Sequence, residues 1–98
     1  MAERTRYLLA YDIRKPKRLR RVHDVAMTYG QPLQYSVFIC DLTKVELIGL
    51  RGALREEMKT DEDSVSIFDL GPPTGRGVEC IEFIGTRRSL PSDEAAIW

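Results

Sequence analysis

The stretch Tyr-Leu-Leu-Ala-Tyr-Asp at residues 7–12, followed by Ile-Arg-Lys-Pro-Lys-Arg-Leu-Arg-Arg at residues 13–21, decides the fold of this 98-residue chain. The first five residues are uncharged and mostly apolar, which is typical of a central strand covered on both faces. Asp12 then ends the apolar run. Because an unpartnered carboxylate is costly to bury, we expect Asp12 at the end of the strand, within reach of water, a cation or backbone donors.

The residues after this strand predict a basic helix. Six of the eight residues at 14–21 are Lys or Arg, and Pro16 suits the first turn of a helix. Positive side chains there oppose the helix dipole, whereas the backbone amides and basic side chains at a helix start can bind phosphate. The run therefore indicates either a solvated charged face or a phosphate-binding surface, whose candidate contacts are Arg14, Lys15, Arg18, Arg20 and Arg21.

Composition indicates one small soluble domain. Hydrophobic residues make up 43% of the chain and charged residues 31%, and the formal net charge is zero. Contact with nucleic acid would therefore depend on uneven charge, with basic residues gathered at 4–21 and acidic ones at 56–63. No apolar run approaches the roughly 18 residues of a membrane span, and no signal peptide is evident, so we expect a cytoplasmic protein without membrane contact.

Apolar periodicity predicts the remaining elements. A Thr43–Glu46 capping box begins a second helix, in which Gly49 and Gly52 suggest close packing on the sheet. Both cysteines, Cys40 and Cys80, fall in predicted strands and are expected to be free buried thiols. The full set is strands at 6–12, 33–42, 64–70 and 78–85, helices at 17–29 and 43–59, and an irregular Gly-Pro segment at 71–77.

Two topologies fit this order. In the first, residues 31–42 hold two short strands with a bend, which gives a β-α-β-β-α-β fold, although so short a segment leaves little room. In the second, 33–42 is one strand, and 64–70 and 78–85 form a hairpin in a four-stranded α/β sheet. Both place the two helices on one face and leave an apolar opposite face, which suggests a two-fold partner. Candidates for that face are Tyr7, Phe38, Phe68 and Phe83.

The motifs Tyr11-Asp12-Ile13, Gln34-Tyr35-Ser36-Val37-Phe38 and Leu70-Gly71, together with the Arg-rich first helix, resemble the Cas2 family of small CRISPR-associated proteins. The resemblance spans about residues 6–84. It implies an α+β, ferredoxin-like sandwich over residues 1–85, with two helices on one face of an antiparallel-rich sheet, and so favours the first topology. It also implies a homodimer through the sheet faces and a tail, residues 86–98, that adds a strand to the partner's sheet.

The same resemblance implies a metal-dependent endonuclease that acts in spacer acquisition, with Asp12 as catalytic residue and ligand of Mg²⁺ or Mn²⁺. Since one aspartate holds Mg²⁺ poorly, a two-fold axis beside Asp12 would supply a second carboxylate. From the residues alone, Asp12 could equally cap the basic helix or pair with Arg14. Tyr11, Ser36 and Phe38 are expected to support the site.

Other functions stay open. Phe38 is followed by Ile39 and Cys40, so a metal ligand that relatives of the Cas2 family could supply directly after Phe38 is missing, which leaves catalysis undecided. His23, the only histidine, is a weak candidate for a general base. The first alternative is a non-catalytic DNA-binding adaptor that bridges dimers of the CRISPR spacer integrase. The second is a small-molecule regulatory module, against which the basic helix argues. The sequence does not choose between RNA, single-stranded DNA and duplex DNA.

Overall fold

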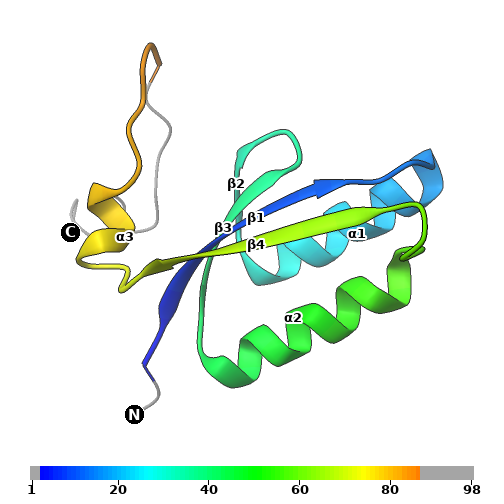
Figure 1. Ribbon diagram of the computed structural model, residues 1–98, viewed down its shortest axis with the longest axis horizontal. Coiled ribbons are helices and arrows are strands. Elements are labelled where there is room, and N and C mark those ends of the chain that lie inside the picture. The colour runs from blue at the N-terminus through cyan, green and yellow to red at the C-terminus, as the bar shows by residue number, and fades with distance from the viewer. Residues whose placement is uncertain (1–2, 87–98) are drawn as a thin grey trace.

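A computed structural model describes residues 3–86 as a four-stranded sheet with two long helices packed on one face (Figure 1). The strand order is β2-β3-β1-β4, and every neighbouring pair is antiparallel. The strand quoted first above is therefore central, as predicted. The elements are β1 (Thr5–Asp12), α1 (Pro16–Tyr29), β2 (Gln31–Gln34), β3 (Val37–Leu42), α2 (Lys44–Glu57), β4 (Ser64–Gly71) and α3 (Arg76–Glu79).

Residues 31–42 form two strands, so the single strand at 33–42 is wrong and the β-α-β-β-α-β order holds. The two strands are joined by a turn at Tyr35 and Ser36, and Ser36 has a φ of 65°. This short segment is enough for two strands because a hairpin connection needs only two residues when its backbone can enter the left-handed region. Ser36, expected on a strand, lies in this turn.

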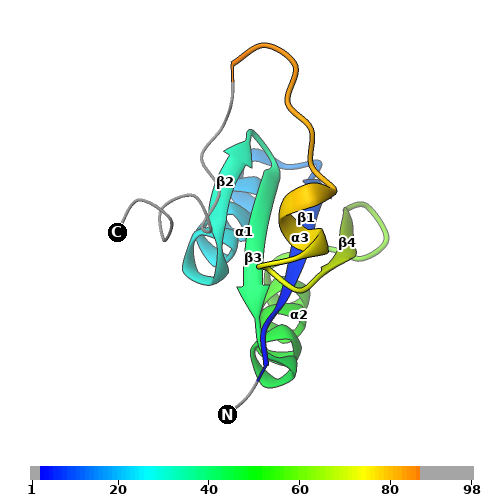
Figure 2. The same cartoon turned by 90° about the vertical axis from the view of Figure 1, so that its left-hand side faces the viewer.

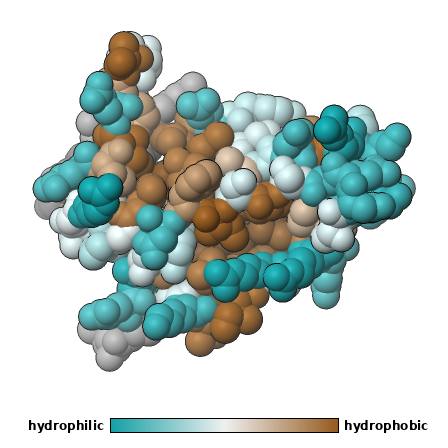
Figure 3. Space-filling model, viewed as in Figure 1, coloured by the Kyte–Doolittle hydropathy of each residue, from teal (hydrophilic) through white to brown (hydrophobic). Residues whose placement is uncertain are grey.

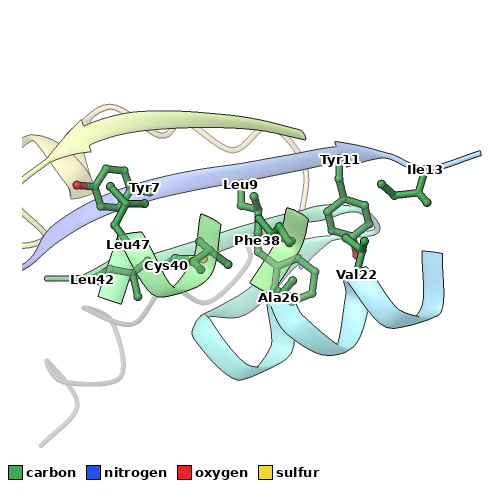
Figure 4. Close-up of a cluster of buried hydrophobic side chains, with 12 residues drawn as sticks. Tyr7, Leu9, Tyr11, Ile13, Val22, Ala26, Phe38, Cys40, Leu42 and Leu47 are labelled. Carbon is green, nitrogen blue, oxygen red and sulfur yellow. The ribbon is translucent and has the colours of Figure 1, made fainter. Parts of the chain in front are cut away.

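The main core lies between the sheet and the two long helices (Figure 4). Tyr7 and Phe38 belong to it, so their expected place on the opposite face is wrong. The sequence could not decide this because both faces of β1 and β3 are apolar, and alternation alone does not say which face the helices cover. The buried members are Tyr7, Leu9, Tyr11, Ile13, Val22, Ala26, Phe38, Cys40, Leu42, Leu47, Leu50 and Leu54.

The opposite side of the sheet, here called the open face, carries a second apolar cluster. Leu33 and Ile39 are buried there, and Leu8 and Phe83 pack against them. Phe68 lies opposite Leu8 in the β1–β4 register and is 52% exposed. The expected apolar face with Phe68 is thus confirmed, whereas Phe83 packs onto this face from a segment that is not a strand. In Figure 3, apolar side chains gather in the middle of the view, and hydrophilic ones occupy the right-hand end.

Residues 76–79 form α3, and residues 80–86 contain no strand, so the strand expected at 78–85 is wrong. The Gly77 N–H donates to the Pro72 carbonyl at 2.9 Å, and a Cβ on Gly77 would lie 2.7 Å from that oxygen. This contact winds the chain into a helical turn, so the Gly-Pro segment does not exclude regular structure. The chain then rises away beyond α3 (Figures 1 and 2).

A buried ion pair holds α3 to the sheet. The fully buried Arg6 side chain donates to both carboxylate oxygens of Asp41, at 2.8 and 2.9 Å, and to the Gly77 carbonyl at 3.2 Å. Such a bidentate pair satisfies the charge that burial would otherwise leave uncompensated. The Arg6 side chain therefore attaches α3 to the sheet.

Both cysteines are free, but only one is buried. Cys40 lies in the core, and burial together with the nearby Asp41 charge raises the pKa of its thiol to about 11. Cys80 follows α3 and is exposed, so its expected burial in a strand is wrong.

The helix boundaries follow the sequence signals. Pro16 opens α1, and the Thr43–Glu46 capping box closes on itself with bonds of 3.1 and 2.8 Å. Gly49 permits a close approach, but to α1 and not to the sheet, since a Cβ there would lie 2.8 Å from the Tyr29 hydroxyl. No helix in the described part of the chain is long and apolar enough to cross a membrane. The predicted crossing strand in the tail lies outside the described residues, apart from residue 86.

Candidate functional site

Asp12 ends β1 at one end of the sheet and is exposed. It lies opposite Ser64 in the β1–β4 register. Within residues 3–86, no hydrogen-bond donor or cation engages its carboxylate. The two structural roles considered for it, capping α1 and pairing with Arg14, are both absent there, because the N-cap of α1 is Lys15 and makes no side-chain cap bond. The carboxylate is therefore open to a cation or to water.

Basic side chains surround the start of α1. Arg14, Lys15, Arg20 and Arg21 are exposed, and none of them forms an ion pair with another described residue. The first turn of α1 contains no acidic residue that could neutralise them. We call the set Asp12, Arg14, Lys15, Arg20 and Arg21 the rim.

Arg18 differs from its basic neighbours because its guanidinium is already engaged. Its Nε donates to Asp63 at 2.8 Å and its Nη2 to Glu62 at 2.8 Å, and the side chain is only 21% exposed. Any phosphate contact by Arg18 would compete with these two carboxylates. The predicted set of phosphate contacts is thus divided into one paired arginine and four unpaired side chains.

Asp63 organises the loop that follows Asp12. Its fully buried carboxylate accepts bonds from the Arg14 N–H at 2.9 Å, the Lys59 N–H at 2.8 Å and Arg18. The Arg18 hydrogen bond, aided by the two backbone donors and opposed by burial, holds the pKa of the Asp63 carboxyl well below its usual range. One carboxylate therefore joins the β1–α1 loop to the turn before β4.

Tyr11 points into the core, on the side of the sheet opposite Asp12. Its hydroxyl shares a 3.1 Å hydrogen bond with Nδ1 of His23, and its ring stacks on Phe38 at a centroid distance of 6.2 Å. Burial, with a contribution from Tyr35, raises the pKa of the Tyr11 hydroxyl, while a bond with Ser36 opposes the rise. Two of the expected supporting residues, Tyr11 and Phe38, thus pack beneath the strand end. The third, Ser36, joins them by accepting the Tyr11 N–H at 3.1 Å.

Three further residues at this strand end are not evident as site residues from the sequence alone. His23 lies seven residues, or about two helical turns, after Pro16, and this spacing puts it on the same face of the helix as Pro16, beside the strand end. Tyr35 is 81% exposed at the tip of the β2–β3 turn. Asp63 belongs to the acidic run at 56–63, where little separates it from Asp61, because two of its three partners, Arg14 and Arg18, are distant in sequence.

The fold and the site together define a small α+β protein that presents one free carboxylate and several unpaired basic side chains at the end of a sheet. The chain belongs to the CRISPR associated protein Cas2 family, whose model matches residues 5–74.

Relatives and solved structures agree with this assignment. The CRISPR-associated endoribonuclease Cas2 of Geobacter sulfurreducens is 41% identical over 66 residues, covering 67% of this chain and 70% of that protein. The CRISPR-associated endonuclease Cas2 of Halalkalibacterium halodurans is 30% identical over 96 residues, covering 93% and 97%. The crystal structure of Streptococcus pyogenes Cas2 matches with a TM-score of 0.71 and 30% identity, covering 82% of this chain and 99% of that one.

Proposed function

We propose that the protein is a CRISPR-associated, Mg²⁺-dependent endonuclease of spacer acquisition that works as a homodimer of ferredoxin-like protomers. The observation that carries the proposal is Asp12, an exposed and unpaired carboxylate beside unpaired basic side chains, in a chain whose relatives are named endoribonuclease or endonuclease. Phosphodiester cleavage needs both kinds of group, because the phosphate must be held while its charge is compensated.

The donor chemistry of Asp12 fits Mg²⁺, which prefers carboxylate and water oxygens. Within residues 3–86 of one chain, no three His, Cys, Asp or Glu side chains come together as a metal site. A second Asp12 from a partner would supply the missing carboxylate. When bound, the ion would polarise a phosphoryl oxygen or activate a water. The chain itself would contribute the Asp12 oxygens and, from Arg14, Lys15, Arg20 and Arg21, the contacts that hold the phosphates.

The open face supports the proposed dimer. Leu8 and Phe68 lie on this face, and strand alternation puts Asp12 on the same side of β1 as Leu8. A two-fold axis through the open face would therefore bury exposed apolar area and turn the two Asp12 side chains toward the same interface. The helices, on the other side of the sheet, would stay outside this dimer.

The test is cleavage of labelled duplex DNA and single-stranded RNA by wild type and Asp12→Ala, with Mg²⁺, Mn²⁺ or EDTA, at matched salt and with the dimer state measured by light scattering. We expect metal-dependent cutting that is lost in the mutant while the dimer persists, and the substrate that is cut identifies the preferred nucleic acid. Equal cutting by both proteins would reject Asp12 as the metal ligand.

A non-catalytic adaptor is the second candidate, favoured by the single carboxylate in an otherwise basic rim. In this case the dimer would bind duplex DNA and bridge dimers of the spacer integrase. Asp12→Ala would then leave spacer acquisition intact, whereas Arg21→Glu would weaken both DNA binding and acquisition. Loss of acquisition in Asp12→Ala, with DNA binding retained, would contradict the adaptor.

A further inference from the structure

A hollow of about 330 Å³ lies on the helix side of the strand end. We call it the Tyr35 hollow. Three elements form it: the end of β1, the first half of α1 and the β2–β3 turn. Its volume lies at the lower end of the roughly 300–1,000 Å³ range of ligand pockets. The lining residues are Tyr11, Pro16, Leu19, Arg20, His23 and Tyr35.

The inner wall of the hollow is rigid. The bond between the Tyr11 hydroxyl and His23 Nδ1, at 3.1 Å, fixes both rings. The fully buried Phe38 supports them from below, because Tyr11 stacks on it and the His23 ring meets it edge-on at a centroid distance of 5.4 Å. The second ring nitrogen of His23 has no hydrogen-bond partner in the described part of the chain. This wall therefore offers an apolar surface with one free polar atom.

The outer wall is an exposed aromatic ring. Tyr35 is 81% exposed, and the next residue, Ser36, is the only non-glycine in residues 3–86 with a positive φ, 65°. This conformation is uncommon for a non-glycine residue, and such strain gathers at functional sites. The exposed Tyr35 ring gains no stability from burial, and the Ser36 conformation adds backbone strain. The turn thus leaves the Tyr35 ring exposed at the edge of the hollow.

Arg20 supplies the charge. It is exposed, forms no ion pair with a described residue, and belongs to both the rim and the hollow. A guanidinium matches the geometry of a phosphate, and an aromatic ring matches the face of a nucleobase. Both groups line the same hollow, and together they match the two parts of a nucleotide, its phosphate and its base.

We infer that the Tyr35 hollow binds one unpaired nucleotide, with its base against Tyr35 and its phosphate on Arg20. The inference rests on the proposed action on nucleic acid and adds a preference for single strands, ends or flipped bases. A paired base inside a duplex has no free face for the ring, so this site discriminates against continuous duplex. Tyr11 and Asp12 are consecutive in β1, so the hollow and the Asp12 carboxylate lie at the same end of this strand, on opposite faces of the sheet.

The test uses the full chain in EDTA, where no metal-dependent cleavage occurs. The probes are a short single-stranded DNA with one 2-aminopurine base, whose fluorescence falls on stacking, and a blunt duplex of the same length. We expect Tyr35→Leu to weaken single-strand affinity on the order of 10-fold and to abolish the quenching, while duplex affinity is unchanged. Tyr35→Phe, which keeps the ring, retains both, and Ile48→Ala, an exposed apolar truncation on α2, changes neither.

The outcomes separate the two proposals. If wild type binds both probes and Tyr35→Leu binds and quenches the single strand like wild type, the subsite is wrong and the proposed function stands. If wild type binds neither probe, both fail. An Arg20→Gln variant adds a second check, because it should weaken single-strand binding while the quenching of the bound fraction persists. Loss of quenching in Arg20→Gln at saturation would contradict the assigned roles of base and phosphate.

Discussion

Two aspartates at the same end of the molecule have opposite surroundings. Asp63 is buried and accepts bonds from Arg18 and from two backbone N–H groups. Asp12 lies opposite the next residue, Ser64, and is exposed with no bond from any described residue. The same side chain thus stabilises the fold at one position and stays available for chemistry at the other.

The difference shows how the site is built. The Asp63 carboxylate holds the Arg14 backbone, so it fixes the loop that begins directly after Asp12. It also engages Arg18, whereas the basic side chains of the rim form no ion pair with a described residue. Under the proposed function, Asp12 binds a metal and needs rigid surroundings, which the Asp63 bond to the Arg14 backbone would supply.

The largest expected effect is on activity, at Asp12. Asp12→Asn should reduce metal-dependent cleavage to background, a loss greater than the roughly 10- to 100-fold that follows removal of an outer-sphere partner. Its melting temperature should stay unchanged, since the carboxylate has no bond to lose in residues 3–86. Cleavage rates and thermal melts of wild type and mutant check this. A mutant with a lower melting temperature and undiminished cleavage would show that Asp12, like Asp63, stabilises the fold and is not needed for cleavage.

The next effect is on stability, at Asp63. Asp63→Asn removes a buried carboxylate that accepts bonds from three residues and leaves Arg18 with Glu62 as its one carboxylate partner among the described residues, so we expect the melting temperature to fall on the order of 10 °C. Asp61→Asn is the matched control, because Asp61 is exposed in the same turn. Equal melting temperatures for the two mutants, measured by calorimetry, would show that the Asp63 bonds do not stabilise the fold.

A smaller effect separates paired from unpaired arginines. Arg21→Ala should weaken duplex binding and lower the slope of log affinity against log salt by about 0.9, the contribution of one phosphate contact. Arg18→Ala should instead lower the melting temperature, because its guanidinium bonds Asp63 and Glu62. Titrations at several salt concentrations check the first statement. An unchanged slope in Arg21→Ala would exclude this side chain from the phosphate contacts.

The smallest effect is the acid dependence of stability. The folded-state pKa of Asp63 is lowered, so its contribution is fully present above the unfolded-state value of about 3.9 and is lost as the pH falls toward the folded-state pKa. Wild type should therefore lose stability on acidification from about pH 4 downward more steeply than Asp63→Asn. Melting temperatures across this range check the slope. Parallel curves would mean that Asp63 does not contribute.

Local signals in the sequence predicted much of the fold. The apolar run of β1 identified the central strand, Pro16 marked the start of α1, and the Thr43–Glu46 box marked the start of α2. Asp12 was predicted at an accessible strand end, where it lies. Each of these features depends on a few consecutive residues, whose periodicity and capping are fixed by backbone geometry.

Only the tertiary structure decided which groups meet. It placed Phe38 beneath the helices, brought His23 to Tyr11 and joined Asp63 to Arg18 across 45 positions of sequence. It also attached α3 to the sheet through a bond from Arg6 to the Gly77 carbonyl. These outcomes depend on which face of a sheet is covered and on which charges become buried together. Local sequence patterns do not reveal these partners, because the topology of the fold, and not the adjacent residues in the sequence, decides which side chains meet.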